Sequence, residues 1–231
     1  MTCAVVCEVA AVHLGVTGDE VASLTHAALT MNLAITALQD TLAQQTTPPS
    51  ADQREALDGH AAAAAALLRT AGVDDALWLH IVERHHEAPA GPVDLSDRPG
   101  LLAELLRRVD IYTAKLSRRA TRAPTTPLRA ARLACLDASG QPDAIGAAML
   151  RVIGLYPPGT WVELVSGELA LVKRTGAKAH TPHVVALRRQ DGTMLPQPTP
   201  RDTADARFHI RGSLDAREVR VRVDHLKALS A

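Results

Sequence analysis

Residues 153–172 read IGLYPPGTWVELVSGELALV, and this stretch marks the point where helical periodicity gives way to strands. Its Tyr-Pro-Pro-Gly segment predicts a turn, because proline and glycine favour turn geometry and interrupt a helix. Trp161, Glu163 and Val165 follow at alternate positions, which is typical of a strand with one buried face. A Ser-Gly pair then predicts a tight turn into a second strand through residues 169–172. The stretch therefore predicts a β-hairpin.

Downstream of this hairpin, two further segments have the composition of strands. PHVVALRR at residues 182–189 is rich in apolar and β-branched residues, and REVRVRV at residues 217–223 alternates valine with charged residues. MLPQPTPRD at residues 194–202 is rich in proline, which lacks the N–H that a central strand needs, so we expect a surface connection there. Residues 156–231 are therefore expected to form a small antiparallel β extension.

Upstream of the hairpin, residues 1–155 have the periodicity of helices. Turn-forming residues interrupt this pattern at residues 15–18, 46–50, 72–75, 88–100 and 123–127. These breaks predict roughly five to seven helices. One helix is expected from Val21 to about Gln44, and Ser50 with Gln53 predicts a capping box at the start of the next. The predicted fold class is mainly α, with a helical bundle in residues 1–155 followed by the β extension.

The composition excludes several classes of partner. Lysine plus arginine (25) equals aspartate plus glutamate (25), so the chain has no overall field that would draw it onto DNA, RNA or an anionic membrane. With only two tryptophans, two tyrosines and one phenylalanine, a platform for stacking single-stranded bases is not expected. Any site for an anionic ligand must therefore be local.

The opening segment MTCAVVCEVAAVHLGV is apolar, but it contains Glu8 and is shorter than the roughly 20 residues that a membrane span needs. It predicts a core helix, and no membrane span is expected. The helical pattern starts without a polar cap, so we expect Met1 to be an internal methionine and the first helix to be truncated. Cys3, Cys7 and Cys135 are odd in number, which favours reduced thiols and a cytoplasmic location.

Chemistry is first suggested by the segment ERHHE, which contains His85 and His86. Adjacent histidines beside acidic residues are typical of metal sites, because neutral imidazole is a good ligand for transition metals. His60 lies on an earlier predicted helix and Asp110 on a later one. The alternative is a solvated helix end whose histidines interact with the negative pole of the helix.

The order of these residues, His60, then His-His-Glu, then Asp-x-Tyr at Asp110, followed by Ile-Gly-x-Tyr-Pro-Pro-Gly, resembles the HD-GYP family. The resemblance runs from about residue 4 to about residue 190. It implies an HD-type helical bundle, a bacterial signalling role and a metal-dependent phosphodiesterase activity on cyclic di-GMP. It also implies that His60, His85, His86 and Asp110 are metal ligands.

The sequence departs from the family at the residues that give the family its name. Met31 and Asn32 stand where the resemblance places a His-Asp pair, and Ile35 stands where it places a lysine. The family's Gly-Tyr-Pro signature is replaced by APAGPVDLSDRPG at residues 88–100, and a first-helix histidine would fall before Met1. In the family the missing aspartate bridges two metal ions, so the resemblance implies that the two-metal mechanism is lost.

The residues that survive could still hold one ion. His60, His85, His86 and Asp110 are the candidate ligands, and the expected cofactor is either none or a single divalent ion of iron, manganese or zinc. The alternative is a set of remnants that hydrogen-bond to one another and to water. No catalytic residue is assigned.

A basic segment follows Asp110. Arg118, Arg119 and Arg122 are expected on the same helix and at its exit, where they could contact the phosphates of a ligand. The alternative is a solvated basic helix end.

These features predict a catalytically degenerate HD-GYP-like signalling module of the bacterial cytoplasm, which binds a cyclic dinucleotide or a signalling protein and could form a homodimer. Two alternatives stay open. One is an active cyclic di-GMP phosphodiesterase with a reduced metal centre, and the other is a structural dimerisation or output domain without a ligand.

Overall fold

A computed structural model describes residues 2–117, 125–137, 139–215 and 219. By packing, the chain divides into two compact units, which we describe separately. The helical unit comprises Met1–Thr125 and Pro142–Met149, and the sheet unit comprises Thr126–Gln141 and Leu150–Ala231. The boundary expected between residues 155 and 156 stays a prediction.

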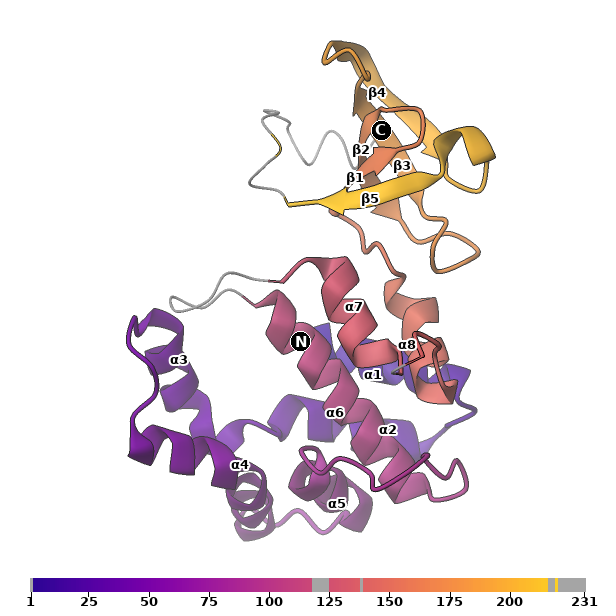
Figure 1. The fold of residues 1–231 in the computed structure, drawn as a ribbon. Coiled ribbons are helices and arrows are strands. Elements are labelled where there is room, and N and C mark those ends of the chain that lie inside the picture. Colours follow the sequence, from indigo (N-terminus) through magenta and orange to yellow (C-terminus); the bar gives the residue numbers. More distant parts are fainter. Residues whose placement is uncertain (1, 118–124, 138, 216–218, 220–231) are drawn as a thin grey trace. The chain divides into compact units, whose positions relative to one another are not determined.

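The helical unit is built from α-helices that pack against one another (Figure 1). Its elements are α1 (Thr2–His13), α2 (Asp19–Thr30), η1 (Leu33–Ile35), α3 (Thr36–Gln44), α4 (Ala51–Thr70), α5 (Ala76–Arg84), α6 (Arg98–Leu116) and the first part of α8 (Ala144–Ile153). α2 packs against α1 and α5, and α6 also packs against α1 and α5. The predicted capping box at α4 is confirmed, with Ser50 and Gln53 each accepting a backbone N–H of the other.

The single helix predicted from Val21 to Gln44 is wrong, because the chain breaks between Thr30 and Thr36. Met31 ends α2 and η1 is a 3-10 turn before α3 begins. The break lets both Met31 and Ile35 reach the core, where they are 3% and 5% exposed. The segment Asp19–Gln44 is long and apolar enough to be considered as a membrane span, but in the structure this interruption divides it.

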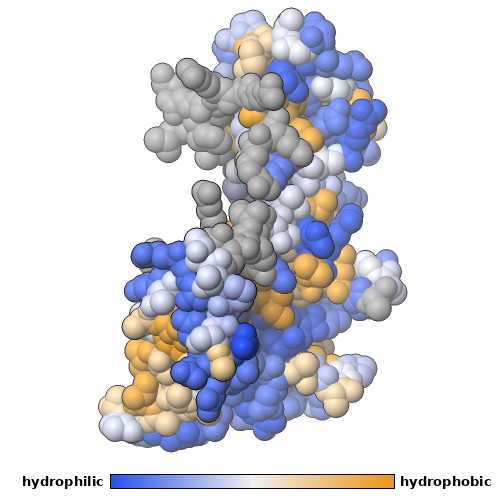
Figure 2. All heavy atoms as spheres, turned by 60° about the vertical axis from the view of Figure 1, so that its left-hand side comes forward, coloured by the Kyte–Doolittle hydropathy of each residue, from blue (hydrophilic) through white to orange (hydrophobic). Residues whose placement is uncertain are grey.

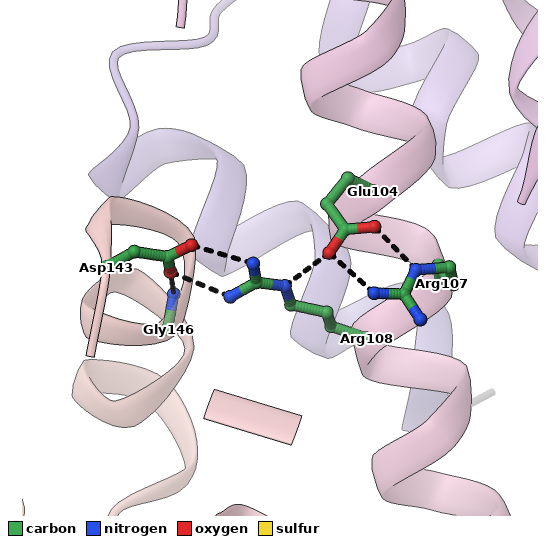
Figure 3. Close-up of polar contacts among 5 residues, drawn as sticks. All are labelled: Glu104, Arg107, Arg108, Asp143 and Gly146. Atoms are coloured by element: carbon green, nitrogen blue, oxygen red, sulfur yellow. Dashed lines mark hydrogen bonds and ion pairs between the residues drawn. The ribbon is translucent and has the colours of Figure 1, made fainter. Parts of the chain in front are cut away.

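A charged network joins α6 to the start of α8 within the helical unit (Figure 3). The buried carboxylate of Glu104 accepts hydrogen bonds from Arg107 and from Arg108. Arg108 also donates to both carboxylate oxygens of Asp143, at 2.7 Å each, and Asp143 accepts the N–H of Gly146 in the first turn of α8. Glu104 is 3% exposed, and this pairing compensates the cost of burying its charge.

The sheet unit contains α7 (Pro127–Cys135), the end of α8, η2 (Ala206–Phe208) and a five-stranded antiparallel sheet (Figure 1). The strands are β1 (Trp161–Leu164), β2 (Leu169–Arg174), β3 (His183–Arg188), β4 (Met194–Asp202) and β5 (Ile210–Leu214). Their order is β4-β3-β2-β1-β5. The predicted hairpin is confirmed as β1 and β2, with Trp161 opposite Leu171, and β3 confirms the strand predicted at residues 182–189.

Residues 194–202 were expected to be a surface connection, but they form β4, which pairs with β3. The prolines are tolerated because β4 is an edge strand, where an absent N–H on the open side costs no ladder bond. The strand predicted at residues 217–223 lies outside the described residues, apart from Val219.

The mainly α class, with a helical bundle and a small β extension, is also wrong. Helices account for 51% of the chain and strands for 14%, which makes this a mixed α/β protein. The sheet carries an apolar cluster on each face, one with Trp161 and Leu171 and the other with Val162 and Leu164. A sheet with two apolar faces has a core of its own, so it is more than an extension of the helical bundle.

Candidate metal centre

Three histidines converge in the helical unit. His60 lies in α4, His85 is the residue that caps the end of α5, and His86 follows it. One ring nitrogen from each lies within 4.8 Å of the others, so the three form a cluster that could hold a metal ion. Contacts of α4 with α5 bring the ligands together across a long stretch of chain.

Backbone carbonyls fix the tautomers of two of these rings. Nδ1 of His60 lies 2.6 Å from the carbonyl oxygen of Leu57, and Nδ1 of His85 lies 2.6 Å from that of Val82. A carbonyl oxygen can only accept, so each Nδ1 carries the proton and donates it. Each Nε2 therefore carries a lone pair and no proton, which is how proteins commonly prepare histidines to bind a metal.

The cluster contains a buried atom with no hydrogen-bond partner among the described residues, Nε2 of His85. His85 is 1% exposed. Burial lowers the pKa of His85 to about 4, against a smaller opposing effect of the Val82 carbonyl. An imidazole held neutral, with an unpaired lone pair in the interior, can bind a cation without first losing a proton.

The other two rings contact each other, with Nε2 of His86 3.2 Å from Nε2 of His60. Since His60 is protonated at Nδ1, His86 donates this hydrogen bond from its Nε2. Burial lowers the pKa of His86 as well, and the nearby charge of Asp110 opposes that shift. An ion bound by both Nε2 atoms would replace this hydrogen bond and move the His86 proton to Nδ1.

A cavity of about 600 Å³ opens onto the cluster. His60, His86 and Asp110 line it, whereas His85 is buried and is not part of its surface. Asp110 thus shares the cavity, although its carboxylate is not one of the three groups within 4.8 Å of each other. Of the four predicted ligands, the structure brings three histidines into one cluster and places the aspartate beside it.

The wall contributed by the α2–α3 break is mainly apolar. Met31, Leu33 and Ile35 line it together with Asn32, so the residues that replace the name-giving pair of the resembled family face the same cavity as His60. The amide oxygen of Asn32 is a poor ligand for transition metals, and the thioether of Met31 is a poor ligand for hard divalent ions. This segment therefore adds no strong transition-metal ligand to the cavity.

The three predicted phosphate contacts, Arg118, Arg119 and Arg122, lie outside the described residues. α6 ends at Leu116, and Ser117 has extended backbone angles. The helix that carries Asp110 therefore ends before Arg118.

Sequence reasoning missed two features of the cavity. Thr113 and Ser117 line it with Asp110, and their spacing along α6 is the signal that could have revealed this stripe. Cys3 of α1 also lines the cavity. Nothing in the sequence indicates this position for Cys3, because a small residue such as cysteine suits both an apolar core and a cavity wall.

Comparison of the chain with models of known protein families, with curated protein sequences and with solved structures finds no match in any of the three. Any functional assignment therefore depends on the sequence motifs and on the geometry of this centre.

Proposed function

We propose that this protein is a catalytically degenerate HD-GYP-like signalling module, which binds a ligand or partner and does not hydrolyse cyclic di-GMP. One observation carries the proposal. One cavity is lined both by His60, His86 and Asp110 and by Met31 and Asn32. These are the positions that the resemblance assigns to a metal site, and some of its ligands are kept here while others are replaced.

A single divalent ion is the cofactor that the cluster fits. Three imidazoles with one side open to a cavity suit zinc, ferrous iron or manganese, with zinc matching three nitrogen ligands best. The free Nε2 of His85 would provide the innermost ligand, and His60 and His86 would complete the set from the cavity surface. When bound, such an ion supplies a Lewis acid that can hold an anionic group.

Hydrolysis of a phosphodiester by the two-metal route needs a carboxylate that holds the two ions close together. Asn32 offers a neutral amide instead, and Met31 offers a thioether. The centre therefore lacks support for a second ion, and we expect binding without turnover.

A second candidate is an active phosphodiesterase with a reduced centre. It is favoured by the open cavity beside the histidines, because catalytic zinc sites also combine three protein ligands with an open position.

Hydrolysis of cyclic di-GMP separates the two candidates. We expect no linear product from the purified protein with manganese, ferrous iron or zinc, measured by chromatography over many hours. Turnover that is lost in His85→Ala would establish the enzyme and contradict the proposal. Turnover that persists in His85→Ala would come from a contaminant. The variant Met31→His with Asn32→Asp is expected to remain inactive, because Ile35 still stands where the resemblance places a lysine and residues 88–100 still lack the family's Gly-Tyr-Pro signature.

A further inference from the structure

Helix α1 is apolar on two faces, and the rest of the helical unit covers one of them. α1 packs against α2 and α6, and its buried residues are Cys3, Ala4, Val6, Cys7, Ala10 and Ala11. On its other face Val5, Val9 and Val12 are 54%, 41% and 59% exposed. Figure 2 shows that apolar residues are exposed on the surface of the helical unit. A surface helix normally carries polar residues on its outer face, so a row of exposed valines indicates a surface for a partner.

The spacing of these residues indicates the kind of partner. Thr2, Val5, Val9 and Val12 are all exposed and follow one another at intervals of three, four and three residues. This is the spacing of the a and d positions of a heptad, with Thr2 and Val9 at a and Val5 and Val12 at d. We call these four residues the α1 seam. Side chains at this spacing fit between those of a second helix that lies along the first.

Two ionisable side chains flank the α1 seam. Glu8 and His13 are the other exposed residues of α1, and in the same heptad they occupy the g and e positions. Among the described residues, neither side chain has an ion pair or hydrogen bond. In a parallel pair of helices, a g residue faces the e residue that lies five positions further along the partner, so Glu8 would face His13 of a second copy. In an antiparallel pair Glu8 would instead lie beside Glu8 of the second copy, where like charges repel.

A membrane surface does not fit this face. α1 has 12 residues, whereas a membrane span needs about 20. Helices that lie on a membrane carry lysine or arginine on their polar face, and α1 has neither while Glu8 is acidic. A second copy of the chain complements both the valines and the flanking charges.

We propose that two copies of this protein associate through the α1 seam, with the two α1 helices parallel and related by a two-fold axis that runs along the pair. The valines of the two seams pack together, and Glu8 of each copy accepts a hydrogen bond from the imidazole of His13 of the other. An imidazole can donate to a carboxylate in either of its protonation states. A two-fold axis makes this contact twice. The contact is short, so we expect a weak dimer with a Kd on the order of 10 μM.

Sedimentation velocity tests the proposal on the full chain at pH 7, with a chelator present so that no metal ion links the copies. We expect the wild type to pass from monomer to dimer as its concentration rises from about 1 to about 200 μM. Val9→Lys places two like charges in the middle of the seam and should weaken the dimer at least about tenfold. Val165→Lys is the matched control, because Val165 is 55% exposed in the sheet unit, and it should leave the dimer unchanged. Circular dichroism of each variant checks that the helices are retained.

A cross-link tests the parallel orientation. Val12→Cys places a thiol at the end of each seam, and the two thiols meet in a parallel pair but lie at opposite ends of an antiparallel one. Glutathione disulfide, which takes up the two electrons as the new disulfide forms, should convert this variant into a covalent dimer. Val165→Cys and the wild type, whose cysteines are buried, should remain uncross-linked under the same conditions.

Three results would overturn the proposal: a wild type that stays monomeric at every concentration, a Val9→Lys variant that dimerises like the wild type, or a Val12→Cys variant that dimerises without cross-linking. Sedimentation with phosphatidylcholine vesicles gives a fourth. If the wild type bound these vesicles as a monomer and Val9→Lys did not, the α1 seam would be a membrane-binding surface. None of these results depends on whether the histidine cluster holds an ion.

Discussion

Glu168 of the sheet unit and His85 of the helical unit are two buried polar groups with different surroundings. In the sheet unit, Glu168 accepts two hydrogen bonds from Arg201, at 2.7 and 3.0 Å, and one from Ser166. In the helical unit, Nε2 of His85 is fully buried without a partner among the described residues. A satisfied group of the first kind contributes to structure, whereas an unsatisfied one costs stability and is tolerated where a ligand can satisfy it. Both kinds occur in each unit, since buried Glu104 of the helical unit is paired with arginines and Arg188 Nε of the sheet unit has no hydrogen-bond partner among the described residues. His85 is distinguished by His60 and His86, whose ring nitrogens lie beside its own.

The largest expected effect is on the response of the two units to acid. The pKa of His85 is lowered by burial to about 4, so as the pH falls below about 6.5 the unfolded chain takes up this proton before the folded chain does. The helical unit should therefore lose on the order of 3 kcal/mol of unfolding free energy between pH 6.5 and pH 4. Hydrogen bonds from Arg201 lower the pKa of Glu168, so the sheet unit keeps that contribution until the pH falls below the pKa of an unfolded carboxyl group, about 4.3.

The two tryptophans allow the units to be followed separately. Trp78 lies in α5 and Trp161 lies in β1, so the variants Trp161→Phe and Trp78→Phe report on the helical and the sheet unit respectively. Urea unfolding with a chelator at pH 7, 5.5 and 4.5 should show the Trp78 signal losing stability first. If the unfolding free energies reported by Trp78 and by Trp161 fell equally with pH, the expected difference between the two units would be contradicted.

A smaller effect on the unfolding free energy is expected from breaking the ion pair between Glu168 and Arg201. Glu168→Gln removes a charge-assisted pair whose side chains are 11% and 22% exposed, and it should lower the unfolding free energy of the sheet unit by about 2 kcal/mol. The control is Glu163→Gln in the same unit. It breaks a pair with Arg211 whose side chains are 39% and 64% exposed, and solvent-exposed pairs contribute about 0–1 kcal/mol. Similar losses of unfolding free energy in the two variants would show that the burial of Glu168 adds little to the strength of its ion pair.

The smallest expected effect has the opposite sign. His85→Leu replaces the unpartnered imidazole with an apolar side chain. It loses the hydrogen bond to Val82 but removes a buried polar atom, so the unfolding free energy at pH 7 should stay equal or rise by about 1 kcal/mol. The same variant should lose the acid response described above and the rise in stability on adding zinc. A loss of more than about 2 kcal/mol would mean that His85 serves structure in the way that Glu168 does.

Part of the candidate site could be predicted from the sequence, because it depends on residue chemistry and local order. The pair His85 and His86 beside acidic residues indicated metal ligation, and His60 and Asp110 joined them through the resemblance to a family. Asp110 remains outside the three-histidine cluster, because its distance from the rings depends on how α6 packs. The wall around Met31 was recognised as a replacement, but its contribution to a shared cavity depends on the break before Ile35.

The sequence by itself determined the features that follow from neighbouring residues, such as the hairpin of β1 and β2 and the capping box at Ser50. Turn geometry and side-chain alternation act over a few residues, so they are legible in one stretch of chain. Tertiary structure alone decided the pairing of β4, the break within residues 21–44 and the burial of His85. Each of these depends on surfaces contributed by distant segments. The prolines of β4 are tolerated because the strand lies at the edge of the sheet. The helix breaks before Thr36 because burial of Met31 and Ile35 in the core is favoured over a continuous helix.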